Sequence, residues 1–299
     1  MLSFVNVSRV VSAVAVAATL MVGTAAAQQE LVMEPLKDSG LTVYPAYEGW
    51  YQNSDGTYTL LVGYYNRNKK QVLDVPIGPA NRIEPGGPDQ GQPTHFVVGR
   101  GWGTIAVKVP KDFGDKKLTW TLTTNGKTVS VPFGLTKGYQ IEPYLDAAMG
   151  NKPPVIRFSE KGEALTGPPK LAAAGVATGA VGEPVTLSYW VTDDGHEETP
   201  TGGSAAAPPP GGAAGPPRRP RVSTTLTKYR GPGTITFADS TPAIEKDKVT
   251  TTATFSMPGE YLIRIEANDA SGVGGGGFQC CWTTAYIKAS IKAANTGGH

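Results

Sequence analysis

The sequence contains little that reactive chemistry commonly uses. Its 299 residues include two cysteines and three histidines, and charged residues make up only 17% of the chain. It has no G-x-S-x-G nucleophile elbow, no H-E-x-x-H zinc helix and no phosphate-binding G-x-x-x-x-G-K-[ST] loop. We therefore expect a protein that is not an enzyme. A carbohydrate-active hydrolase remains a weaker alternative, because two carboxylates on separate loops leave no linear signature.

Helical periodicity and an excess of one charge are also missing. The best helical candidate after residue 27 is Tyr144–Met149, which is too short to be stable alone. The 27 basic and 25 acidic residues give a net charge of +2, which becomes +1 if Arg9 is removed with a signal peptide. Such a balance does not predict nucleic acid as a partner, because nucleic-acid binding requires a surface rich in Lys and Arg.

The first 27 residues have the pattern of a secretory signal. Arg9 is followed by an apolar run over 10–22 and by the small residues Thr24–Ala27. This pattern predicts cleavage between Ala27 and Gln28 and export to the bacterial periplasm or the extracellular space. The alternative is an uncleaved anchor helix. No cysteine follows this segment directly, so we expect no lipid-modified N-terminus. We also expect no transmembrane span once the segment has been cleaved.

Abundant glycine (38) and proline (25) favour short strands joined by turns. In the N-terminal region, 40–136, alternation predicts strands over 58–65, 72–77 and 102–109. A hairpin is predicted over 118–133, with its turn at Asn125-Gly126. We expect this region to be an all-β sandwich domain, followed by a linker over 137–154 that contains Pro153-Pro154.

The C-terminal region, 155–292, has the same character. Its predicted strands cover 184–191, 222–229, 233–238, 249–256, 261–268 and 282–292. In the fifth of these, Tyr261, Ile263 and Ile265 share the core face. Arg264 and Glu266 share the outer face. The segment 197–220 is rich in Pro, Gly and Ala and has no large apolar side chain, so we expect it to be disordered, like the tail 293–299.

Several segments of this region resemble the PKD and related immunoglobulin-like repeats of bacterial surface proteins. They are GEPVTL (182–187), VTDDG (191–195), GPGTITF (231–237) and PGEYLIRIEAND (258–269). The resemblance covers about 171–292 and implies an immunoglobulin-like β-sandwich that acts as a spacer or as a protein or carbohydrate contact module. The N-terminal half resembles exported bacterial proteins without an assigned activity. Its stretch Gln92–Phe96 (QPTHF) is distinctive but indicates no chemistry.

The two cysteines, Cys280 and Cys281, are adjacent and follow four glycines. Export would place them in an oxidising compartment, where the only internal bridge possible joins the two neighbours. Such a ring is geometrically demanding, and a reduced pair or intermolecular bridges remain open. Strand alternation predicts that Cys281 faces the core and Cys280 the outside.

The sandwich topology predicts that loops carrying Asp193, Asp194 and Asp269 emerge at one end, with His196 nearby. Oxygen ligands of this kind suit Ca²⁺, although Asp193-Asp194-Gly195 also reads as a simple turn. Aromatic residues are the remaining binding-surface candidates: Trp50, Tyr51, Tyr65, Phe278 and Trp282.

The sequence thus favours an exported structural or interaction module of the cell envelope or extracellular space, whose partner is a protein or a glycan. The alternative is a metal- or ligand-binding accessory subunit, for example of a redox enzyme, that uses the loop end around Asp193, Asp269, Cys280 and Cys281.

Overall fold

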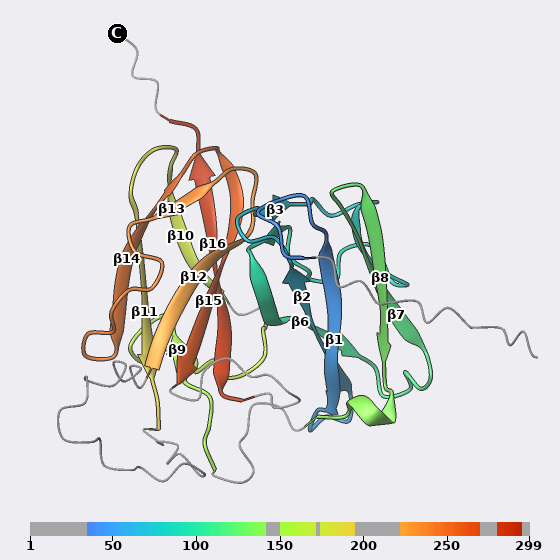
Figure 1. Ribbon diagram of the computed structural model, residues 1–299. Helices are drawn as coiled ribbons and strands as arrows, with labels where there is room; N and C mark the ends of the chain where they lie inside the picture. The colour runs from blue at the N-terminus through green and yellow to red at the C-terminus, as the bar shows by residue number, and fades with distance from the viewer. Residues whose placement is uncertain (1–34, 142–149, 172–173, 195–221, 270–279, 295–299) are drawn as a thin grey trace, which may run out of the picture. The chain divides into compact units, whose positions relative to one another are not determined.

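A computed structural model describes residues 35–141, 150–171, 174–194, 222–269 and 280–294 (Figure 1). Within these ranges the regular elements are strands and one 3₁₀ turn, η2 (Lys137–Tyr139). The all-β prediction is therefore confirmed for the described part of the chain. The predictions for 1–27, 144–149 and 197–220, and for most of 293–299, lie outside the described residues.

The N-terminal half, residues 36–141, contains two three-stranded antiparallel sheets and one short strand pair. The first sheet has the order β1 (Val43–Gln52), β2 (Tyr58–Asn66), β6 (Gly99–Val109). The second has the order β4 (Asn81–Glu84), β7 (Lys117–Thr124), β8 (Lys127–Gly134), and β3 (Leu73–Asp74) pairs with β5 (His95–Phe96). The β7–β8 turn lies at Asn125-Gly126, as predicted, because both residues adopt the positive φ that a tight hairpin needs.

One core lies between these two sheets. Leu60, Val62 and Tyr64 alternate along β2 and point into it, as period-two spacing predicts. Trp120 from the opposite sheet is fully buried there, and its Nε1 donates to Oδ1 of Asn81 at 3.0 Å. The buried indole N–H is thus satisfied, as burial of a tryptophan normally requires.

The C-terminal half, residues 150–292, contains two four-stranded sheets. One has the order β10 (Ala174–Ala180), β16 (Trp282–Lys292), β15 (Gly259–Asp269), β12 (Val222–Arg230). The other has the order β13 (Ile235–Phe237), β14 (Lys248–Phe255), β11 (Val185–Thr192), β9 (Val155–Arg157). The pair β10–β16 is parallel and the other pairs are antiparallel. A second core lies between these sheets and includes Leu187, Tyr189, Ile263 and Ile287.

The six strands predicted for the C-terminal region agree with β11 to β16 within two residues at each end. The differences occur where alternation is weak. β3 extends over only two residues of the predicted 72–77, and no ranges were predicted for β1 or for the short strands β4, β5 and β9. β10 was also missed, because its sequence AGVATGA consists of small residues without a polar and apolar alternation.

The two halves belong to one compact unit that begins at Leu36. The outer face of β15 and β16 is covered instead of exposed: Trp282 is fully buried and packs with Leu61 from β2, beside Trp102 and Ala106 from β6. This corrects the expectation that Trp282 is a surface residue. We call the set of contacts between the two halves the joint; its polar members are described below.

Candidate functional site

The adjacent cysteines form a disulfide across a cis peptide bond at the start of β16. The vicinal ring, one of the alternatives that the sequence left open, is thus confirmed. Cys281 is buried (0% exposed), as expected, but the expectation that Cys280 faces the outside was wrong, because it is only 1% exposed. The residues lie just before the strand begins, so strand alternation does not govern the direction of their side chains.

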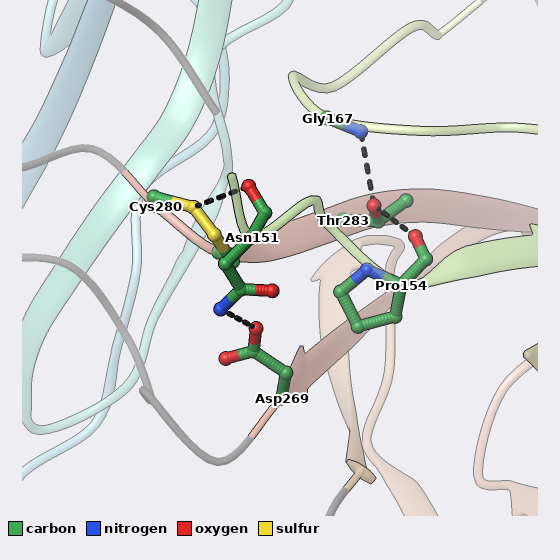
Figure 2. The surroundings of a disulfide bond; sticks show 7 residues. Asn151, Pro154, Gly167, Asp269, Cys280 and Thr283 are labelled. Atoms are coloured by element: carbon green, nitrogen blue, oxygen red, sulfur yellow. Dashed lines mark hydrogen bonds between the residues drawn. A yellow bond between two sulfur atoms is a disulfide. The ribbon is translucent and has the colours of Figure 1, made fainter. Parts of the chain in front are cut away.

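Residues 151–154, Gly167 and the end of β15 lie around this ring (Figure 2). Sγ of Cys280 lies 4.0 Å from the carbonyl oxygen of Asn151, a packing contact, because a disulfide sulfur has no hydrogen to donate. Nδ2 of Asn151 donates to Oδ2 of Asp269 at 2.7 Å. The hydroxyl of Thr283 donates to the carbonyl of Pro154 and accepts from the amide of Gly167. These contacts hold residues 151–154 against the end of β15 and the start of β16.

The three predicted calcium ligands, Asp193, Asp194 and Asp269, all lie within the described residues. Asp269 is buried and its carboxylate accepts from Asn151, an amide donor, at 2.7 Å. The described residues, which include Asp193 and Asp194, contain no group of three or more His, Cys, Asp or Glu side chains that could hold a metal. His196 lies outside the described residues.

The predicted aromatic surface residues do not form one patch. Tyr65 is 36% exposed and lies opposite Tyr44, whereas Tyr51 lies opposite Thr59 at the other end of β1. Seven positions of an extended strand separate Tyr44 from Tyr51, or about 20 Å. Nε1 of Trp50 donates to the carbonyl of Thr136 at 2.7 Å, and Phe278 lies outside the described residues.

Polar side chains of the joint form three groups, the first of which is built around Asp74. Its Oδ1 accepts from Nζ of Lys228 at 2.8 Å and lies 2.9 Å from Nδ1 of His95. Burial would raise the pKa of Asp74, but the hydrogen bonds from Lys228 and His95 outweigh it and hold that pKa below its usual value. Burial lowers the pKa of His95, against the opposing effect of Asp74. At neutral pH the imidazole is therefore neutral.

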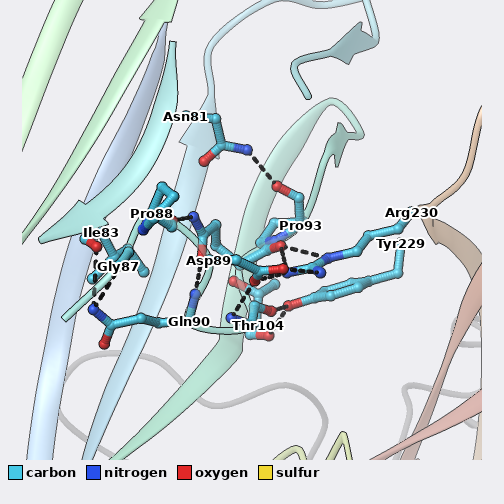
Figure 3. A network of polar contacts seen from close by, with 12 residues as sticks. Asn81, Ile83, Gly87, Pro88, Asp89, Gln90, Pro93, Thr104, Tyr229 and Arg230 are labelled. Carbon is cyan, nitrogen blue, oxygen red and sulfur yellow. Dashed lines mark hydrogen bonds and ion pairs between the residues drawn. The ribbon is translucent and has the colours of Figure 1, made fainter. Parts of the chain in front are cut away.

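The second group connects the Pro/Gly-rich loop before β5 with the end of β12 (Figure 3). Arg230 forms a forked pair with the Asp89 carboxylate, at 2.8 and 3.0 Å, and also donates to the carbonyl of Gln92. The Tyr229 hydroxyl lies 2.6 Å from the carbonyl of Gly91 and 2.9 Å from that of Thr104. A planar guanidinium and a buried phenol thus fix the loop in orientation as well as position.

The third group contains the charges at the centre of the joint. Arg264 on β15 donates to the carbonyl of Trp102 at 3.1 Å and pairs with Glu266. Arg100 pairs with Glu48 at 2.6 Å, and the Glu48 carboxylate also accepts from the amide of Gly103. Burial raises the pKa of Glu48 to about 7, although Arg100 and the Gly103 amide act in the opposite direction.

Reasoning from the sequence alone missed this joint, although two of its signals were visible. The stretch Gln92–Phe96 was distinctive without a function, and it now supplies contacts to both Tyr229 and Arg230, since the amide of Thr94 donates to the carbonyl of Tyr229 at 3.0 Å. Arg264 and Glu266 were predicted to share the outer face of their strand, and that face is covered by the N-terminal half. The period-two alternation of side chains identifies the outer face of a strand, but it does not show what covers that face.

Over the described ranges, no helix has the length and hydrophobicity needed to span a membrane. No family model and no curated protein sequence matches the chain. Among solved structures, the crystal structure of domains 4 and 5 of the S-layer protein SbsC aligns with 84% of this chain and 98% of its own length. The identity is 12% and the TM-score 0.23, a likeness too distant to carry an argument about function.

Proposed function

We propose that the protein is an exported, non-catalytic module of the bacterial cell envelope or extracellular space that acts through contact with a protein or glycan. In this proposal the two halves are immunoglobulin-like β-sandwich domains, the second of them PKD-like. The fold supports a contact role because each half uses its interior for a packed core.

The observation that carries the proposal is the joint. Its buried charges are used to hold the chain together: Arg264 reaches the backbone of Trp102, Lys228 reaches Asp74, and Arg230 reaches Asp89. Hydrogen bonds to charged groups are among the stronger ones in proteins, and several of them across one interface resist relative movement. A fixed pair of sandwiches suits a spacer or scaffold that presents surfaces at a constant separation.

Cell fractionation with a binding assay tests this function. The full chain is expressed in a bacterial host, its N-terminal residue is determined, and purified protein starting at Gln28 is sedimented with washed envelope material. We expect export, cleavage after Ala27, and co-sedimentation that is lost when the envelope is treated beforehand with either a protease or a glycan-degrading enzyme. The enzyme responsible identifies the partner class.

A chain expressed without residues 1–27 is the matched control and should stay in the cytoplasm. The proposal fails if the full chain stays cytoplasmic with Met1 in place. It also fails if the purified protein turns over a substrate, for example in a panel of glycans.

A further inference from the structure

A cavity of about 160 Å³ lies within the joint. Both halves contribute to its wall, which includes His95, Arg100, Thr225, Thr227, Lys228 and Arg264. The two threonines alternate on β12 and therefore face the same side of the sheet. They stand opposite Glu266 and Arg264 in the β12–β15 register. The cavity thus has hydroxyl and cationic groups on one side and residues of the N-terminal half on the other.

The charges in this wall are mostly positive. Arg100, Lys228 and Arg264 are the basic side chains of the wall beside His95, and Glu266 is the carboxylate among the lining residues. The partners of Arg100 and Lys228, which are Glu48 and Asp74, lie outside the wall. Cations that converge on a partly desolvated space attract an anion more strongly than the same cations would at a water-exposed surface.

One residue of this wall has a buried donor without an acceptor. Nε of Arg264 is buried and makes no hydrogen bond to any described part of the chain, although the same guanidinium reaches Trp102 and Glu266 through its terminal nitrogen. A buried donor without a partner is costly, and a charged one more so, so an acceptor that reaches this guanidinium would be stabilising.

From these observations we infer that the cavity binds a small oxyanion, such as phosphate, sulfate or a short carboxylate. The anion accepts hydrogen bonds from Arg264 and from the hydroxyls of Thr225 and Thr227, beside the charges of Arg100 and Lys228. Because the ligand touches both halves, it stabilises the joint by mass action. The inference does not depend on the proposed envelope role, and either one can fail without the other.

Titration calorimetry on the mature chain in chloride buffer tests the site, with sodium phosphate, sulfate and acetate as probes at constant ionic strength. We expect saturable binding of at least one probe to a single site, and a matching rise of Tm above that produced by chloride. Binding of acetate alone also supports the site and assigns the ligand to the carboxylates. If no probe binds more strongly than chloride, the cavity contains water and the inference is overturned.

Two double variants make the test specific. Thr225→Val with Thr227→Val removes the hydroxyls without changing charge and should weaken binding at least tenfold. Thr186→Val with Thr252→Val makes the same change on the opposite sheet, between paired residues of β11 and β14, and should bind like the wild type. Equal binding by all three proteins, or an equal loss in both variants, would show a general salt effect and overturn the inference.

Arg264→Lys provides a check that does not depend on the threonines. It keeps the positive charge but removes Nε and the planar fork. We expect weaker anion binding, with folding confirmed from far-ultraviolet circular dichroism. If this variant folds and binds the probe with wild-type affinity, Arg264 does not hold the ligand and the inferred site is wrong.

Discussion

Lys228 and Asp74 lie 154 positions apart in the chain, yet Nζ of the lysine is 2.8 Å from Oδ1 of the aspartate. The lysine side chain is only 6% exposed, whereas that of the aspartate is 55% exposed. The pair therefore joins β12 of the C-terminal half to β3 of the N-terminal half. The lysine side chain is buried and the carboxylate lies at the surface.

A double-mutant cycle with Lys228→Met and Asp74→Ala should give a coupling energy of about 1 kcal/mol, measured by denaturant unfolding. The more exposed pair of Lys108 and Asp55, also at 2.8 Å, lies within the N-terminal half and serves as the control. Its cycle should give a clearly smaller coupling energy, since both of its partners are solvated. Equal coupling in the two cycles would contradict the role of Lys228 in the joint.

Glu48 should make stability depend on pH near neutrality. Burial raises its folded pKa to about 7, so the folded state keeps a proton that the unfolded state has lost. The stabilisation that this bound proton gives the folded state is fully present below pH about 4.5, the ordinary pKa of Glu. It is lost as the pH rises through 7. Between pH 5 and 8, the free energy of unfolding of the wild type should therefore fall relative to that of Glu48→Gln, by roughly 1 to 3 kcal/mol.

The comparison with Glu48→Gln is needed because His95 acts in the opposite direction. Its folded pKa is lowered, so its contribution is lost as the pH falls, and this effect is common to both proteins. Glu84→Gln, which alters an exposed carboxylate, is the matched control for the loss of one acidic group. A Glu48→Gln profile parallel to that of the wild type would show that the folded Glu48 carboxyl titrates normally.

Gly63 on β2 should not tolerate even a methyl group. A Cβ at this position would overlap the Glu48 carboxylate, the carbonyl of Gly101 and the guanidinium of Arg100. Two of these groups are held by the ion pair and the third is backbone, so Gly63→Ala should lower the free energy of unfolding by roughly 1 to 3 kcal/mol. Gly138→Ala is the control, because a Cβ there meets no atom within 4 Å, and its unfolding midpoint should stay near the wild-type value. Wild-type stability of Gly63→Ala would show that the ion pair moves aside freely.

The vicinal disulfide should be visible by intact-mass analysis of the monomer. Reduction adds two hydrogens, about 2 Da, and exposes two alkylatable thiols. Because Cys280 and Cys281 are buried, reduction of the native protein should be at least about tenfold slower than in denaturant. The variant with Cys280→Ala and Cys281→Ala should show no shift. An unchanged wild-type mass after reduction in denaturant would rule out the ring.

Much of the strand content could be predicted from the sequence for a local reason. Side chains alternate across a strand, so spacing alone identifies the core face of β2, β11 and β15. The turn at Asn125-Gly126 follows from the positive φ that these two residues accept readily. Because the chain has only two cysteines, a disulfide could join them only to each other or to another chain. These inferences need no knowledge of any distant part of the chain.

The joint was decided only by tertiary structure. Arg264 and Trp282 belong to faces that period two marks as outward, and they are buried because a sheet more than 150 positions away covers them. Burial of an outer face depends on the complementarity of two surfaces, and no local pattern encodes which surfaces meet. The same packing turns the distinctive stretch Gln92–Phe96 into a set of contacts and brings the cations of the two halves around one cavity.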